Sequence, residues 1–162
     1  MKKSRVAFLG LFTAFAMILS FVESQIPTFV AILGIKLGLP NIAIIIILYR
    51  FGWKEASIIS LLRVVLTSLL FGTVLSMLYS IAGAVLSLVA MILLKKVLST
   101  VTISVIGGVC HNIGQILVAI LVTETQQLLY YLPVLIISGV IAGIVVGIIA
   151  ALSVKKIEKI DL

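Results

Sequence analysis

The side chains able to do chemistry are few in this chain, and the densest group is the run HNIGQ that begins at His111. His111 and Gln115 are four residues apart, so on a helix they share one face, with Gly107 one turn before them. Gly108 and Asn112 form the adjoining face. Imidazole and amide groups donate and accept hydrogen bonds, and the glycines let a ligand or a backbone approach closely. We expect a ligand site here; the alternative is hydrogen bonding between helices.

Arg63 is a second candidate, because it lies inside the apolar stretch LLRVVLTSLLFG. A charge at the centre of a bilayer costs about 2.5–3.5 kcal/mol on insertion scales, so it is retained for a reason. Glu23 is a possible ion-pair partner, which would make Arg63 structural. Alternatively, the planar guanidinium would bind an anionic group of a ligand, for which its fork of donors is suited. The sequence leaves both roles open.

Several kinds of enzyme and metal site are disfavoured. Cys110 is the single cysteine, which excludes an internal disulfide and a multi-cysteine metal cluster. The chain has no GxxxxGK[ST] phosphate loop, and Asp161 is its single aspartate. With one aspartate, a magnesium site built from paired aspartate-rich clusters is not expected. His111 also has no acidic partner in its own span. We expect a protein that is not an enzyme and that carries no cofactor and no metal.

The elements that position these residues are expected to be membrane helices. The chain of 162 residues is 63% hydrophobic and 10% charged, with a mean hydropathy of +1.42, which is too apolar for a soluble domain of this length. A spanning helix needs about 20 mostly apolar residues. The sequence predicts one all-α membrane domain over residues 1–162, a six-helix bundle with spans at about 6–22, 40–53, 55–74, 75–94, 101–122 and 133–154.

The segment between the first two spans, residues 23–39, is apolar but interrupted by Pro27, Gly34 and Gly38. Irregular backbone at membrane depth is tolerated where protein or a water-filled cavity covers it. We therefore expect a loop that covers the outer mouth of a cavity as a lid, with Asn41 near it. A merely irregular connection is the alternative.

Charge placement predicts the orientation of the bundle. With the N-terminus in the cytoplasm, the inner helix ends carry most of the basic residues, as the positive-inside rule requires. Lys36 and Glu124 then lie outside, and both termini lie inside. The net charge of +7 follows from this arrangement and gives no argument for nucleic acid. The inner basic residues are Lys2, Lys3, Arg5, Arg50, Lys54, Lys95, Lys96, Lys155, Lys156 and Lys159.

Three stripes of small residues are spaced for helix contacts. One stripe, Ser76, Ser80, Gly83 and Ser87, lies on the expected fourth span; Ser80 is a candidate ligand contact, and close packing is the alternative. A second stripe, Gly139, Gly143, Gly147 and Ala151, is expected to pack inside the bundle. The third is the pair Gly10 and Ala14 in the first span, a candidate contact for a partner protein, with packing inside the bundle as the alternative.

The features that resemble a known family lie along almost the whole chain: Glu23 with Ile26 and Pro27, GIKLGLPN (34–41), Arg63, the stripe of Ser76, Ser80, Gly83 and Ser87, Met91, HNIGQ (111–115), YLP (131–133), and Gly139 with Gly143. The chain resembles the Gx transporter family, also labelled heptaprenyl diphosphate synthase component I. That family is similar to the substrate-binding S components of energy-coupling factor transporters. The resemblance implies a six-helix bundle with both termini inside and a substrate pocket near its outer half, covered by the loop after the first span.

The resemblance also implies partners. A small-residue motif on the first span would bind a membrane scaffold subunit that is itself bound to two cytoplasmic ATPases, and Gly10 and Ala14 are the matching positions. The expected function is binding and translocation of a small, vitamin-like or anionic molecule across a bacterial cytoplasmic membrane. The expected site residues are Arg63, His111, Asn112, Gln115, Asn41, Ser80 and Glu23. The alternative is a non-catalytic membrane subunit in isoprenoid or quinone metabolism.

Overall fold

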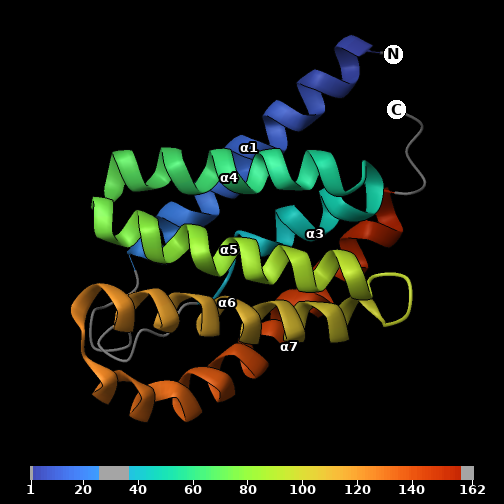
Figure 1. Cartoon of the computed structure of the whole chain (residues 1–162). Coiled ribbons are helices and arrows are strands. Elements are labelled where there is room, and N and C mark those ends of the chain that lie inside the picture. The colour runs from blue at the N-terminus through green and yellow to red at the C-terminus, as the bar shows by residue number, and fades with distance from the viewer. Residues whose placement is uncertain (1, 26–36, 158–162) are drawn as a thin grey trace.

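The computed structural model describes the backbone of residues 2–25 and 37–157 and the side chains of residues 5–25 and 37–157. Over these ranges the regular structure is entirely helical, as the sequence predicts. The helices are α1 (Lys2–Ser24), α3 (Asn41–Arg50), α4 (Trp53–Phe71), α5 (Val74–Leu94), α6 (Thr100–Thr123), the short 3-10 helix η1 (Gln126–Tyr131) and α7 (Leu132–Ile157). Figure 1 shows their arrangement.

Four segments are long and apolar enough to cross a membrane: Arg5–Ser24, Val74–Leu94, Thr100–Thr123 and Gln126–Ile157. These segments correspond to most of α1, to all of α5 and α6, and to η1 together with α7. The expected third span is shifted toward the N-terminus, because α4 covers Trp53–Phe71. The helix α4 is 19 residues long but is not one of these four apolar segments. It carries three charged residues, Lys54, Glu55 and Arg63. These four apolar helices indicate a protein of the membrane type.

The expected second span, at 40–53, corresponds to the short helix α3, of 10 residues. At about 1.5 Å per residue it is roughly 15 Å long, half of the ~30 Å hydrocarbon core. Pro40 and Gly38 precede it, and Gly38 adopts a positive φ of 67° that a glycine tolerates. At its other end Gly52, with φ 106°, turns the chain directly into α4.

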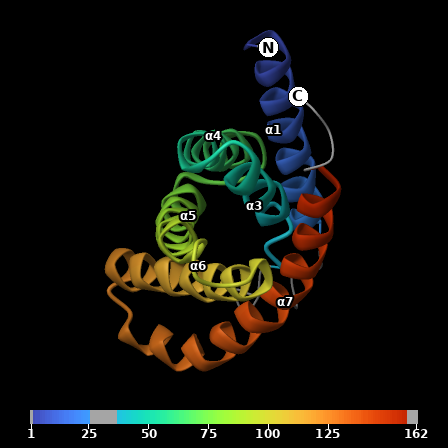
Figure 2. The ribbon, with the colours of Figure 1, turned by 90° about the vertical axis from the view of Figure 1, so that its right-hand side faces the viewer.

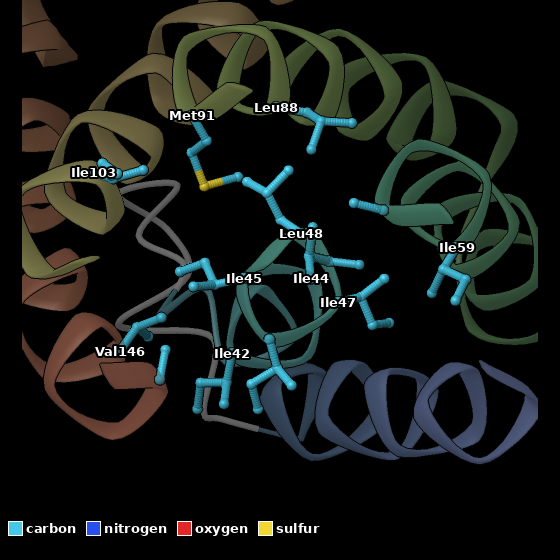
Figure 3. Close-up of a cluster of buried hydrophobic side chains, with 13 residues drawn as sticks. Ile42, Ile44, Ile45, Ile47, Leu48, Ile59, Leu88, Met91, Ile103 and Val146 are labelled. Carbon is cyan, nitrogen blue, oxygen red and sulfur yellow. The ribbon is translucent and has the colours of Figure 1, made fainter. Parts of the chain in front are cut away.

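This short helix forms the centre of the molecule. Figure 2 shows α1, α4, α5, α6 and α7 arranged around α3. Seven consecutive residues of α3, from Ile42 to Leu48, are buried. Figure 3 shows α3 side chains meeting Ile59, Met91, Ile103 and Val146, which come from four surrounding helices. A helix that is apolar on all sides is expected at the centre of a bundle.

Charged side chains lie at both ends of α3. The backbone N–H of Gly38, just before the helix, donates to Glu23 Oε1 at 2.6 Å. Lys95 Nζ donates to the carbonyl of Leu48, near the last turn, at 3.2 Å. An anion near the N-terminus and a cation near the C-terminus both stabilise a helix, because each interacts favourably with the helix dipole. These contacts tie the helix to α1 at one end and to α5 at the other.

The stripe from Gly139 to Gly147 packs against α6, as predicted. A Cβ added at Gly143 would lie 2.5 Å from Val105 Cα, and one added at Gly147 would lie 2.8 Å from Val101 Cα. Contacts this short exclude even an alanine without a shift of backbone. The small residues therefore let α6 and α7 approach closely along much of their length.

The helix ends gather at two opposite ends of the molecule. In Figure 1 the start of α1, the start of α4, the α5–α6 connection and the end of α7 lie on the right. The α4–α5 and α6–α7 connections lie on the left. We call the right-hand end the basic end, because the described side chains there include seven cations: Arg5, Arg50, Lys54, Lys95, Lys96, Lys155 and Lys156.

Candidate functional site

A small cavity of about 20 Å³ lies where α3 begins, between α6 and α7. Since α3 ends near Lys95 and is only half as long as a spanning helix, its start lies roughly halfway along the bundle. The volume is enough for about one water molecule. The lining residues are Leu37, Gly38, Asn41, Ser104, Gly108, His111, Asn112, Gly139, Ala142, Gly143 and Val146.

Asn112 is the most deeply buried polar group of this cavity, with 3% of its surface exposed. Its amide Nδ2 donates to the carbonyl of Leu135 at 2.7 Å and lies 3.4 Å from Ser138 Oγ, so it connects α6 to α7. These two contacts use the amide nitrogen. The side chain is thereby held in one orientation, with its acceptor oxygen available for hydrogen bonding.

His111 lies on the neighbouring face of α6 and is half-buried. A Cβ added at Gly83 of α5 would lie 3.0 Å from His111 Cε1 and 2.9 Å from Gln115 Cγ. This glycine therefore makes room for both side chains at the α5–α6 contact. His111 reaches the cavity as well as α5, whereas Gln115 is not among the residues that line the cavity.

Glycines form much of the cavity wall. A Cβ at Gly108 would lie 2.7 Å from the carbonyl oxygen of Gly139, and one at Gly139 would lie 3.1 Å from Asn112 Nδ2. The backbones of α6 and α7 thus meet beside the cavity. This close approach exposes peptide groups, rather than bulky side chains, to anything that enters it.

Arg63 belongs to a different cluster, near the end of α1. Its side chain is 8% exposed, its Nη1 lies 3.3 Å from Ser20 Oγ, and it is attracted electrostatically by Glu23. Its Nε has no hydrogen-bond partner among the described residues. Glu23 in turn accepts from Gly38. The described contacts therefore support the structural alternative for Arg63, because they join α1 and α4 to the start of α3.

Two further residues were predicted to belong to the site. Asn41 lines the cavity, and Ser80 on α5 does not line it. Close packing describes most of the stripe that contains Ser80: Gly83 contacts α6, and Ser87 Oγ would lie 3.1 Å from a Cβ at Gly107. The predicted lid falls largely on residues 26–36, which lie outside the described residues. Binding of a ligand by the predicted residues stays a prediction.

The pair on the first span, Gly10 and Ala14, is exposed. A Cβ added at Gly10 would meet nothing within 4 Å, so this face of α1 is not used for packing among the described residues. This face of α1 is exposed to lipid or to a partner protein.

Two residues of these clusters were missed by the sequence reasoning. Ser104, which is buried and lines the cavity, lies four residues before Gly108 and eight before Asn112, so it shares their helix face. Ser20 precedes Glu23 by three residues and bonds Arg63 from the same side of α1. In both cases the helical spacing to a predicted site residue could have identified the serine from the sequence.

Among the described residues, no group of three or more His, Cys, Asp or Glu side chains could hold a metal ion. Comparisons with curated proteins and with solved structures find no similar protein. The family model described as heptaprenyl diphosphate synthase component I, in contrast, matches residues 12–153. This match includes the residues of the cavity, the buried arginine cluster and all of α3 to α6. Since it covers most of the 162 residues, the chain belongs to the heptaprenyl diphosphate synthase component I family.

Proposed function

We propose that this protein is the substrate-binding and translocating membrane subunit of an uptake transporter of the energy-coupling factor type. It binds a small molecule within the bundle, spans a bacterial cytoplasmic membrane six times with both termini inside, and is not an enzyme. The observation that carries the proposal is the cavity at the start of α3, lined by Asn41, Ser104, His111 and Asn112.

The position of this cavity favours a transport role. Interrupted helices that begin near the middle of the membrane are a recurring feature of transporter binding sites. Here α3 is such a half-length helix, preceded by Pro40 and Gly38. Because the cavity holds only about one water as described, a larger ligand requires the start of α3 or the helices beside it to move apart.

The lining favours a substrate with an uncharged hydrogen-bonding group. The described lining residues include no Lys, Arg, Asp or Glu, and Arg63 is in contact with Ser20 and is attracted by Glu23. Asn112 and Ser104 supply hydrogen-bonding groups, and Leu37, Ala142 and Val146 supply apolar contact. An amide, hydroxyl or ring nitrogen joined to an apolar body fits these groups better than a carboxylate does.

Transport against a gradient requires an energy source outside this chain, because the sequence contains no phosphate loop for ATP. We propose that α1 binds a membrane scaffold subunit through the exposed face that contains Gly10 and Ala14. Small residues let two membrane helices approach closely, and the space beside Gly10 is open within the described structure.

The test is ligand retention followed by uptake. Native mass spectrometry of the gently purified protein should detect a retained small molecule, and Asn112→Leu should remove it. Gly10→Leu and Ala14→Leu should leave retention of the molecule intact and abolish its uptake in cells. The added side-chain bulk would separate α1 from the helix of the scaffold subunit. Val85→Phe on the exposed surface of α5 is the matched control and should keep both. Uptake that survives both α1 substitutions would contradict the assignment.

The alternative, a membrane subunit in heptaprenyl diphosphate metabolism, predicts different partners. Affinity purification from native membranes should recover ATPase and scaffold subunits if the transport proposal is right. Recovery of a prenyl synthase instead, together with a retained polyprenyl chain, would favour the alternative.

A further inference from the structure

The side-chain amide of Asn112 is fixed in one orientation by its contacts with α7. Its Nδ2 donates to the carbonyl of Leu135 at 2.7 Å and lies 3.4 Å from Ser138 Oγ. A carbonyl can only accept a hydrogen bond, and the Ser138 hydroxyl donates its own hydrogen to the Leu135 carbonyl at 2.9 Å. Both partners therefore require the amide nitrogen on the α7 side, and Oδ1 is the atom left for other contacts.

The oxygen of this amide is an acceptor that no described residue satisfies. Asn112 lines the cavity at the start of α3 and is 3% exposed, and its bonds to the described residues use its nitrogen. A buried acceptor without a donor is unfavourable, because folding has removed its hydrogen bonds to water. A molecule that enters the cavity and offers an N–H group to Oδ1 would remove this cost.

Asn41 brings complementary groups from the start of α3. Its side chain lines the same cavity, and its Nδ2 would lie 3.3 Å from a Cβ added at Gly38, which also lines the cavity. The described residues provide no acceptor for this nitrogen. An acceptor on α6 and a pair of N–H donors on α3 therefore border one space. The described residues that line it include no Lys, Arg, Asp or Glu.

We propose that this cavity selects neutral molecules that carry a carboxamide or lactam group. The N–H of such a group donates to Asn112 Oδ1, and its carbonyl oxygen accepts from Asn41 Nδ2. An ester or a carboxylate cannot donate, and a site built to hydrogen-bond one group rejects analogues that lack it. An alcohol carries its donor and its acceptor on a single oxygen, whereas these two contacts come from two helices. This selectivity rests on the proposed function, because it names the class of molecule that the same cavity binds.

The experiment uses the full chain in mild detergent and three probes that share a phenyl ring: benzamide, methyl benzoate and benzoate. Dissociation constants are measured from the rise of the thermal transition with probe concentration. Benzamide should bind at least about tenfold more tightly than methyl benzoate, the effect of one buried acceptor left without a donor. Benzoate should not bind measurably, because it also lacks a donor and brings a charge into an uncharged cavity.

Two variants assign the preference to Asn112. Asn112→Leu should lower the ratio of the benzamide and methyl benzoate affinities to about one. Each probe partitions into detergent equally with either protein, so a change in this ratio reports the cavity. Ser138→Ala is the matched control, since it removes a contact of the same amide and does not line the cavity; it should keep the wild-type ratio.

The wild-type ratio tests the need for a donor without any substitution. Equal binding of benzamide and methyl benzoate, binding of benzoate, or a ratio unchanged in Asn112→Leu would overturn the carboxamide selectivity and leave the cavity a ligand site. A molecule retained from the cell that carries no N–H donor would also overturn it. The proposed function fails separately, if no probe shifts the thermal transition and no molecule is retained on purification.

Discussion

Arg63 lies buried against α1, with Ser20 3.3 Å away and Glu23 attracting it. At the scale of single residues this is the clearest case in which a charge has a structural reason to be inside the bundle. The Glu23 carboxylate also accepts from Gly38 at 2.6 Å. One acidic side chain at the end of α1 thus accepts from the residue before α3 and attracts the cation in the middle of α4.

We expect Arg63→Met to destabilise the protein by about 1.5–3 kcal/mol, because it removes the charged contact to Ser20 and the cation that attracts the half-buried Glu23. Methionine keeps most of the stem volume and removes the charge. The thermal transition in detergent measures this loss.

The double variant Glu23→Gln with Arg63→Met removes both charges and should recover part of the stability, since neither charge is then left without the other. A double variant as unstable as the single one would contradict the pairing. If Arg63→Met instead folds normally and loses ligand, Arg63 binds substrate.

In contrast to Arg63, Asn112 is expected to affect ligand binding more than stability. Asn112→Leu removes the 2.7 Å bond to Leu135, which is worth about 0.6–2 kcal/mol between membrane helices, and it removes the polar wall of the cavity. We expect a modest fall in the thermal transition together with loss of the retained ligand.

Ser138→Ala is the control for Asn112, because it removes the weaker 3.4 Å contact to the same amide and does not line the cavity. It should keep the ligand. If both variants keep it, Asn112 serves only to join α6 and α7.

At the scale of elements, α6 presents two different faces. Gly107, His111 and Gln115 face α5, while Gly108 and Asn112 face α7. The first face contacts Gly83 and Ser87 of the α5 stripe, and the second contacts the glycines of α7. Because both contacts bring backbones close together, α5, α6 and α7 form one tightly packed layer beside the cavity.

This packing predicts a contrast between two glycines. Gly143→Ala should destabilise the protein by roughly 1–3 kcal/mol, the usual effect of overpacking, because its Cβ would lie 2.5 Å from Val105 Cα. Gly10→Ala should cost nothing measurable, since nothing lies within 4 Å of its Cβ. Equal thermal transitions of the two variants would show that α6 and α7 are less closely packed than described.

At the scale of the whole molecule, the seven described cations of the basic end lie together because the helix ends there gather on one side (Figure 1). The positive-inside rule predicts that such an end faces the cytoplasm. The opposite end carries the α6–α7 connection, with the exposed residues Glu124 and Tyr130, the latter 83% exposed.

Cysteine labelling tests this orientation on a Cys110→Ser background. An impermeant thiol reagent added outside intact cells should label Glu124→Cys and leave Lys96→Cys unlabelled, and permeabilising the cells should expose the latter. Both positions are exposed in the structure, so accessibility of the side chain does not limit the reaction. Labelling of position 96 from outside would contradict the orientation.

The sequence by itself determined the helical class, the four long apolar helices and the two faces of α6, because helical periodicity and apolar length are local properties. It also predicted that the stripe from Gly139 to Gly147 packs inside the bundle, and this is confirmed.

The tertiary structure decided between the alternatives for the polar residues. The sequence offered Glu23 on the first span as a partner of Arg63 and also a common site for Arg63 and Asn112; the packing places Arg63 against α1 and Asn112 in a separate cavity with α3 and α7. The sequence predicted a second span at 40–53 that is shorter than the others, but not that it is a 10-residue helix buried at the centre of the bundle, because an apolar run near prolines and glycines fits a span or a buried core helix equally well. Those choices depend on contacts between residues far apart in the chain, which only the packing of the helices around α3 establishes.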